Sequence, residues 1–138
     1  EATGYWEGKK PGDVDVLFTE IMFGDFRSDC GGGLMGGLGL APSGDSGLEH
    51  AVFQPCHGSA PDIARQGVAN PFAMILSAAM MLEWLGTKHD NEEMRRDGDA
   101  MRVAVDQVVT EGQALTRDLG GTATTKDAAA AVEAVLFP

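Results

Sequence analysis

The stretch EHAVFQPCHGSAPDIARQGVANP, from Glu49 to Pro71, constrains the fold of this chain more than any other. Its three apolar residues at 51–53 predict a short buried strand, and it ends where a long apolar segment begins. The part between is an irregular loop rich in hydrogen-bonding groups: Gln54, His57, Ser59, Asp62 and Asn70. Two interpretations stay open, a ligand-binding loop or a connector whose polar groups satisfy its own turns.

The charge of the chain excludes two classes of partner. Its 138 residues fit one domain, and 43% apolar residues indicate a soluble globular protein. The formal net charge is −11 with no basic patch, so nucleic acid and anionic membranes would be repelled. The longest apolar run, 71–82, is too short to span a bilayer, and the first ten residues lack the apolar stretch of a signal peptide. We therefore expect no nucleic acid, no membrane and a cytoplasmic location.

The two cysteines, Cys30 and Cys56, lie far apart without the spacing of a metal site, so we expect reduced thiols. Cys56 is followed by His57, which is the residue pairing of a nucleophile and its base. Catalytic pairs of this kind usually meet in space from separate segments, so the adjacency does not predict catalysis.

The first third of the chain predicts little regular structure. We expect a polar arm or loop over 1–12 and a single α/β domain over 13–138. The segment 13–20 predicts a mostly buried strand, because β-branched and apolar residues alternate and then run together. A short helix is expected to begin near Asp25.

A glycine-rich stretch follows, and Gly31, Gly33 and Gly36 spell GxGxxG. The dinucleotide-binding fingerprint opens a helix directly after a strand, which is not the order here. We therefore expect these glycines to serve close backbone packing and a helix that gives way to a loop, continued through 42–44.

The C-terminal half has a helical pattern. From Pro71 or Phe72 to Leu85 nearly every residue is apolar, which predicts a buried helix that ends at Gly86. Asp90 with Glu93 predicts a capping box for a second helix. Its apolar face is made of Met94, Met101, Ala104, Val105 and Val108.

The last helix has its own start signal. Thr124 with Asp127 predicts a capping box, after a loop over 117–121. The apolar stripe that docks this helix is made of Ala128, Ala131, Val132, Val135 and Leu136.

Asp25 and Asp29 form a second chemical constellation. Four residues apart on a helix, they share one face and allow two carboxylates to converge on a hard cation such as Mg²⁺ or Mn²⁺. Acidic residues near a helix start also serve as caps and dipole partners, so spacing alone leaves both interpretations open.

The segment HGSAPDIARQGVANP resembles the adenosine-binding loop of the β-decarboxylating dehydrogenases, the family of isopropylmalate, isocitrate, homoisocitrate and tartrate dehydrogenases. The similarity runs upstream through TEIMFGDFRSDCGGGLMGGLGLAPS and downstream to RDLGGTATTKD, over about residues 9–136. It implies an α/β fold with helices packed on a small sheet, a partial isocitrate/isopropylmalate dehydrogenase-like fold that is not a Rossmann unit.

The resemblance also implies a cofactor, a metal and a reaction. NAD is expected over NADP, because Asp62 stands where NAD-specific members accept hydrogen bonds from the adenosine ribose. GDFRSD at 24–29 matches the family's GDxxSD, so Asp25 and Asp29 are expected to hold Mg²⁺ or Mn²⁺. The reaction would be oxidation of a 2-hydroxy acid by hydride transfer, followed by loss of the β-carboxylate. The cofactor-binding positions are Gln54, His57, Gly58, Ser59, Ala60, Asp62, Ile63 and Asn70.

Three positions depart from the family pattern. Ile21 replaces a usual Asn, Gln54 replaces a frequent Glu, and Arg27 replaces an aliphatic residue. The first two put the geometry at the nicotinamide end in doubt. In family members the catalytic tyrosine and lysine and the substrate-clamping arginines lie upstream of the matched part, so no catalytic residue is predicted here.

Two classes of function follow. The chain is either the C-terminal cofactor- and metal-binding part of an NAD-dependent 2-hydroxy acid dehydrogenase, working with its missing N-terminal half, or a free-standing nucleotide-binding or scaffold domain. A homo-oligomer, at least a dimer, is expected in either case. The resemblance places a subunit contact near an apolar strip of Leu34, Met35, Leu38 and Leu40.

Overall fold

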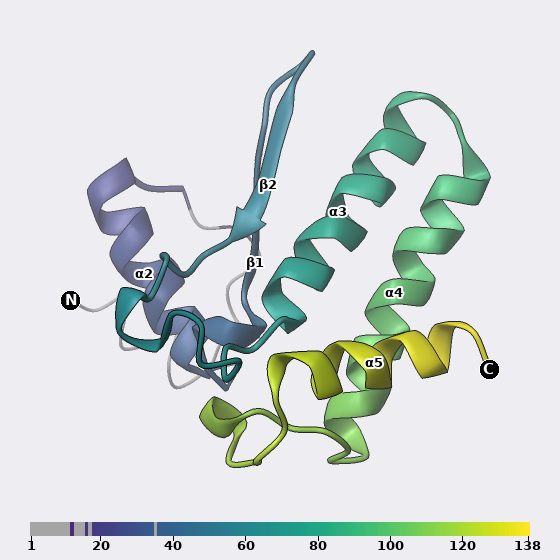
Figure 1. Cartoon of the computed structure of the whole chain (residues 1–138). Helices are drawn as coiled ribbons and strands as arrows, with labels where there is room; N and C mark the ends of the chain where they lie inside the picture. The colour runs from purple at the N-terminus through teal and green to yellow at the C-terminus, as the bar shows by residue number, and fades with distance from the viewer. Residues whose placement is uncertain (1–11, 13–15, 17, 35) are drawn as a thin grey trace.

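A computed structural model describes residues 12, 16, 18–34 and 36–138, so most of the predicted arm over 1–12 lies outside the described residues. The fold is α/β with helices packed on a small sheet, as the sequence predicts (Figure 1). The helices are α2 (Ile21–Leu34), α3 (Phe72–Lys88), α4 (Glu92–Thr110) and α5 (Thr125–Leu136). The strands are β1 (Pro42–Ser46) and β2 (Ala51–Pro55). Single 3₁₀ turns are η2 (Leu38–Leu40), η3 (Pro61–Ile63) and η4 (Arg117–Leu119).

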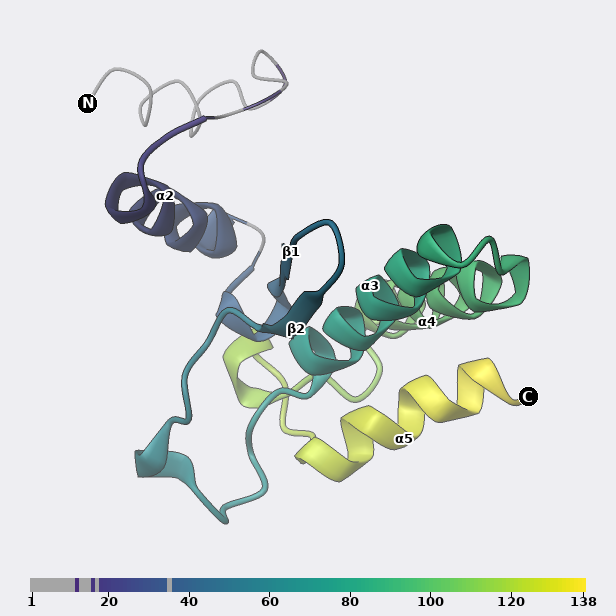
Figure 2. The same cartoon turned by 90° about the horizontal axis from the view of Figure 1, so that it is seen from above.

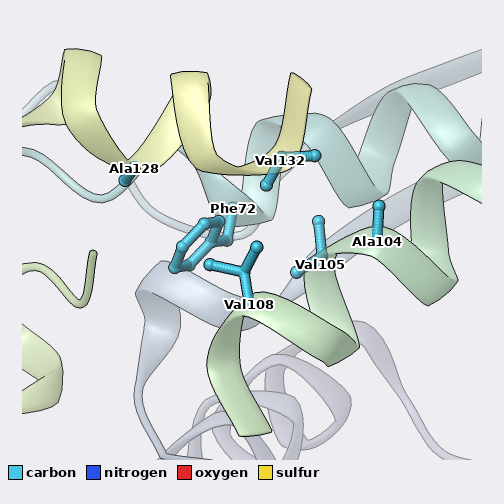
Figure 3. Close-up of a cluster of buried hydrophobic side chains, with 6 residues drawn as sticks. All are labelled: Phe72, Ala104, Val105, Val108, Ala128 and Val132. Carbon is cyan, nitrogen blue, oxygen red and sulfur yellow. The ribbon is translucent and has the colours of Figure 1, made fainter. Parts of the chain in front are cut away.

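The core lies where α3, α4 and α5 meet. Helices α3 and α4 run side by side, and α5 crosses near the start of α3 (Figure 1). Phe72 is fully buried and points between α4 and α5 (Figure 3). The rest of the buried cluster comes from the two predicted apolar stripes: Ala104, Val105, Val108, Ala128 and Val132. These stripes are therefore confirmed, and burial of a Phe side chain contributes roughly 2–3 kcal/mol to stability.

Two glycines allow the close crossing of α3 and α4. A Cβ on Gly98 would lie 2.7 Å from the carbonyl oxygen of Ala79, and one on Gly86 would lie 2.8 Å from that of Asn91. The prediction that Gly86 ends α3 is wrong, because the helix continues to Lys88 and uses Gly86 to admit the start of α4.

The start of α4 is shifted by one residue from its prediction. Asn91, not Asp90, is the N-cap, and its Oδ1 accepts a hydrogen bond from the backbone N–H of Met94 at 3.1 Å. Asp90 has a φ of 49° and forms an ion pair with Arg95 at 3.0 Å instead. A residue in the left-handed region cannot take the extended conformation of an N-cap, so Asn91 takes that position.

The capping box of α5 is confirmed. Thr124 Oγ1 accepts a hydrogen bond from the backbone N–H of Asp127 at 3.2 Å, and the carboxylate of Asp127 accepts one from the backbone N–H of Thr124 at 2.9 Å. Bonds from Thr124 to the carboxylate hold the pKa of Asp127 below its ordinary value.

The sheet is one antiparallel hairpin in which Pro42 pairs with Pro55 and Ser46 with Ala51. The predicted strand at 51–53 is confirmed within β2, but the predicted loop at 42–44 is wrong because those residues form β1. Gly44 is needed opposite Phe53, whose ring carbons would lie 2.9 Å from a Cβ at that position.

The hairpin packs on α3 through an aromatic contact. The rings of Phe53 and Trp84 lie 6.1 Å apart between centroids, and Lys88 Nζ lies 4.8 Å from the Trp84 ring. Lys88 also donates a hydrogen bond to the carbonyl oxygen of Glu49. The hairpin is thereby held along the length of α3.

Helix α2 is longer than predicted and poorly covered. It begins at Ile21 rather than near Asp25, and it continues through the glycines at 31–33, which therefore do not follow a strand as a Rossmann fingerprint would. It meets the rest of the described chain at η2, where a Cβ on Gly32 would lie 2.9 Å from a Leu38 methyl. Phe26 is 75% exposed.

The strand predicted over 13–20 falls partly outside the described residues. Where it is described, at 16 and 18–20, the chain is not in a strand. Val16 is 85% exposed and Phe18 is 100% exposed, against the expected burial. A strand requires a hydrogen-bonded neighbour, and the described sheet contains only β1 and β2.

Candidate functional site

The loop between β2 and α3 extends away from the body of the protein (Figure 2). It borders an open hollow of about 990 Å³ that also reaches η4 and the start of α5. The residues that line the hollow are Gly39, His57, Gly58, Ser59, Ala60, Ile63, Ala64, Arg65, Gly67, Val68, Ala69, Asn70, Arg117, Asp118, Thr125 and Lys126.

The outer part of the loop is shaped by its own backbone. Ala60, Arg65 and Gly67 have φ values of 44°, 65° and 68°, so the chain reverses around η3. The N–H of Ile63 donates to the carbonyl oxygen of Ala60 at 3.1 Å, and Gln66 Nε2 donates to that of Asp62 at 2.8 Å. Part of the polar content of the loop therefore satisfies its own turns, as the connector interpretation holds.

The inner end of the loop is held by α5. Thr125 donates two hydrogen bonds to it, from its backbone N–H to the carbonyl oxygen of Gly67 at 2.8 Å and from Oγ1 to that of Ala69 at 2.5 Å. Thr125, the first residue of α5, therefore holds the inner end of the loop against the start of α5, and both segments line the hollow.

A carboxylate joins the loop to η4. Asp118 Oδ2 accepts a hydrogen bond from Asn70 Nδ2 at 2.9 Å, and Asp118 Oδ1 accepts one from the buried Thr116 hydroxyl at 2.6 Å. Asn70 Oδ1 in turn accepts one from the backbone N–H of Phe72 at 2.9 Å. This chain of bonds links the hollow directly to the buried core residue Phe72.

The structure brings most of the predicted cofactor residues to the hollow and leaves two outside. Gln54 pairs with Ser43 in the hairpin and is exposed on the face away from α3. Asp62 is exposed on η3 and does not line the hollow. The predicted residues that line it are His57, Gly58, Ser59, Ala60, Ile63 and Asn70.

The hollow has cations that sequence reasoning did not assign to the site. Arg65, Arg117 and Lys126 line it, and none of them forms an ion pair within the described part of the chain. Lys88 and Arg102, elsewhere on the surface, are both paired with carboxylates. Three cations against the one carboxylate of Asp118 give the hollow a net positive charge in a chain of net charge −11, which suits it to an anionic ligand.

The two candidate metal ligands lie on α2. Asp25 and Asp29 are both exposed and stand one helical turn apart, with Cβ atoms about 6 Å apart by helix geometry. Among the residues that the structure describes, no group of three or more His, Cys, Asp or Glu side chains is placed to hold a metal ion. The hard oxygen donors suit Mg²⁺ or Mn²⁺, but two carboxylates supply only part of a coordination shell.

Cys56 and His57 do not form a nucleophile and base. Cys56 Sγ lies 3.6 Å from the carbonyl oxygen of Pro42, while His57 Nδ1 contacts the carbonyl oxygen of Gly58 at 2.9 Å. Both cysteines are free thiols in the structure, and both are exposed.

The fold and the hollow define a helix-rich α/β domain with a cation-lined hollow at its surface. The chain belongs to the isocitrate/isopropylmalate dehydrogenase family, whose sequence profile matches residues 8–135. It is 52% identical over 117 residues to an isocitrate/homoisocitrate dehydrogenase of Thermus thermophilus, which covers 85% of this chain and 33% of that protein. It is 50% identical over 125 residues to a 3-isopropylmalate dehydrogenase of Lactococcus lactis, covering 88% of this chain and 34% of that protein.

Solved structures agree. Isocitrate dehydrogenase from Methylococcus capsulatus superposes with a TM-score of 0.84 at 40% identity, over 98% of this chain and 39% of that one. A β-decarboxylating dehydrogenase from Thermococcus kodakarensis gives a TM-score of 0.83 at 37% identity, over 98% of this chain and 38% of that one. The chain thus spans about a third of the length of the curated relatives it matches. Within the described part, no helix is long and apolar enough to cross a membrane.

Proposed function

We propose that this chain holds the adenosine half of NAD and two ligands of a divalent metal, as the C-terminal part of a dehydrogenase that oxidises and decarboxylates a 2-hydroxy acid. The observation that carries the proposal is the hollow beside the loop, lined by six of the eight predicted cofactor residues. Its volume of about 990 Å³ lies at the upper end of the range typical of small-molecule sites.

The lining suits a nucleotide in two ways. Ile63, Val68 and the alanines of the loop offer apolar surface for a purine, and the backbone near Gly58 allows close approach. Arg65, Arg117 and Lys126 offer unpaired positive charge for phosphate groups. An apolar face beside several cations matches the two parts of a phosphorylated adenosine.

NAD is proposed over NADP because of Asp62. Its exposed carboxylate stands beside the hollow on η3, where it would accept hydrogen bonds from the ribose hydroxyls and repel a 2′-phosphate. Arg65, three residues further along, is the cation that would oppose this preference.

Asp25 and Asp29 would hold Mg²⁺ or Mn²⁺ together with groups from outside the described residues. When bound, the metal would polarise the substrate hydroxyl and stabilise the enolate. The base and the substrate-binding groups would come from the rest of the fold, in the same or another chain, so we expect no turnover by these 138 residues alone.

Calorimetric titration tests the nucleotide site. NAD and AMP should bind, nicotinamide mononucleotide should not, and NADP should bind about tenfold more weakly than NAD, since an unpaired contact costs 1–3 kcal/mol. The Asp62→Asn substitution should narrow the gap between NAD and NADP, while Asp97→Asn on the exposed face of α4 serves as the matched control. Binding of nicotinamide mononucleotide without AMP would overturn the assignment of the loop to adenosine.

Paramagnetic Mn²⁺ tests the metal ligands. It should broaden NMR signals around residues 24–30, and the double substitution Asp25→Asn with Asp29→Asn should abolish this effect. Broadening centred on the acidic face of α4 instead would remove the site from α2.

An absorbance assay separates the dehydrogenase from the alternative of a nucleotide-binding scaffold. Isocitrate, isopropylmalate and tartrate are each offered with NAD and Mn²⁺, first to this chain alone and then with the N-terminal portion of a relative added. NADH formed only in the second case supports the proposal, whereas nucleotide binding without NADH in either case favours the scaffold.

A further inference from the structure

We propose that Asp118 is the positioning residue of the nucleotide site, the group that holds the end of the cofactor loop in its binding conformation. The inference rests on the proposed function for the identity of the ligand. It adds a role for a carboxylate 48 residues beyond the loop.

The loop needs such a fixed point because its outer part is not tied to the body. Within the described residues, hydrogen bonds of 57–66 are made inside the loop itself. Bonds to the rest of the protein occur at its ends, from Cys56 N–H to the carbonyl oxygen of Ala41 at 3.1 Å and at 67–70. The conformation of the outer loop therefore depends on how these ends are held.

We call the hydrogen-bonded group of Asn70, Thr116 and Asp118 the inner anchor of the loop. Asp118 is its charged member. One carboxylate oxygen accepts the Thr116 hydroxyl and the other accepts the Asn70 amide. Thr116 and Phe72 are both 0% exposed, so each end of the chain of bonds reaches the core. A carboxylate that accepts from both sides binds more strongly than a neutral acceptor would.

Gly39 closes the anchor from the opposite side. A Cβ there would lie 2.5 Å from Asp118 Oδ2 and 2.8 Å from Asn70 Nδ2, so only glycine leaves this hydrogen bond undisturbed. Gly39 has no group that could contact a nucleotide by a side chain, yet it lines the same hollow. The substitution Gly39→Ala should therefore disturb the hydrogen bond between Asn70 and Asp118 by steric contact, without removing either polar group.

Loss of the anchor should lower the fraction of molecules whose loop is in the binding conformation, and the apparent affinity falls by that fraction. For the Asp118→Ala substitution we expect NAD and AMP to bind roughly tenfold to a hundredfold more weakly, by the same factor for both, as the loss of a charged hydrogen bond predicts. Gly39→Ala should give a smaller loss in the same direction.

A swap of donors and acceptors distinguishes positioning from direct contact with the nucleotide. In the double substitution Asn70→Asp with Asp118→Asn, the new carboxylate still accepts from the Phe72 N–H and from the amide at 118, and that amide still accepts from Thr116. A positioning role predicts that the swap restores affinity lost in Asp118→Asn alone. A direct role of the Asp118 charge predicts no rescue.

Hydrogen exchange measured without nucleotide decides the matter even if the proposed function fails. Asp118→Ala should speed exchange of the backbone amides at 57–69 while those in α4 stay protected, and the swap should restore protection. The control Asp97→Asn should change neither. If Asp118→Ala does not fold, Asp118→Asn, which keeps one acceptor oxygen, takes its place.

Two results would overturn the inference: unchanged exchange at 57–69 in the Asp118 variants, or a swap that fails to restore it. If wild-type protein binds no nucleotide while exchange responds as expected, the proposed function fails and the positioning role stands.

Discussion

Helices α3, α4 and α5 share a buried core, whereas α2 shows most of its apolar side chains to solvent. Phe72 at the start of α3 is 0% exposed, while Phe23 and Phe26 on α2 are 55% and 75% exposed. The two regions contain the same kinds of residue, so composition does not set the difference. The difference comes from the neighbours of each helix in the described structure. Helices α3, α4 and α5 pack against one another, whereas α2 contacts chiefly η2.

The two regions differ in what they can do alone. The C-terminal helices form a packed support that holds the loop and its hollow, and they need nothing further to bury their stripes. Helix α2 carries the proposed metal ligands, and its apolar side chains are mostly exposed, a condition that often marks an interaction surface: Ile21, Met22, Phe23, Phe26 and Leu34. We therefore expect α2 to be covered by a second copy or by further residues of a longer chain.

Replacing phenylalanines in the two regions should give the largest contrast. Phe72→Ala should lower the free energy of unfolding by about 3–5 kcal/mol, because it leaves a cavity among α4 and α5. In protein diluted until it is monomeric, Phe26→Ala should change it by less than about 0.5 kcal/mol, as for an exposed position. Denaturant unfolding followed by circular dichroism measures both, and equal losses would show that Phe26 is buried within the monomer.

Alanine in place of glycine should have opposite signs in the two regions. Gly98→Ala should cost about 1–3 kcal/mol, because the Cβ would meet the carbonyl oxygen of Ala79. Gly31→Ala has no atom within 4 Å of its Cβ and should stabilise α2 by roughly 0.5–1 kcal/mol. Thermal melts of the two variants check this, and a destabilised Gly31→Ala would indicate a neighbour on that face.

The capping box of α5 predicts a pH dependence. Thr124→Ala should cost about 1 kcal/mol, and the nearby exposed Thr122→Ala should cost little. The pKa of Asp127 is lower in the folded state than the ordinary 3.8, so its contribution is present above that value and is lost as the pH falls below it. Unfolding measured between neutral and acidic pH should show this loss, and Asp127→Asn should remove it.

Substitutions on the exposed face of α2 should change the oligomeric state while having the smallest effect on the stability of the monomer. Light scattering at micromolar protein is expected to show at least a dimer, and Phe26→Ser should shift it toward monomer while Val103→Ser on α4 should not. The predicted apolar strip is narrower than expected, because Leu40 packs against the core, and Met35 lies outside the described residues. A monomeric wild-type chain would contradict the expectation.

The sequence predicted what is local or periodic. The stripes of α4 and α5 and the capping box at Thr124 follow from spacing along one helix, and the structure confirms them. The error at Gly86 arose because a glycine that ends a helix and one that admits a neighbour look alike in sequence. The error at 42–44 arose because Gly44 was taken for a loop residue, whereas in β1 it leaves room for the ring of Phe53 on the paired strand.

The candidate site was predicted only in part, because a sequence motif reports residues that are neighbours along the chain. Six residues of the loop were identified from one contiguous motif, and they line the hollow. Arg117, Asp118, Thr125 and Lys126 form its other wall but are far away in the chain, and no periodicity reports such a contact. Their local sequence shows only a loop and a helix start.

The anchoring of the loop from the C-terminal side also sets an order of events during synthesis. The carbonyl oxygen of Ala69 accepts its hydrogen bond from a residue 56 positions later, and the Asn70 amide donates one to a residue 48 positions later. The ribosome therefore releases the loop well before it makes Asp118 and Thr125, and the hollow has only one wall until then. Contacts of such long sequence separation form late because loop closure must come first. A nascent chain stalled before residue 118 should thus be unable to retain a nucleotide.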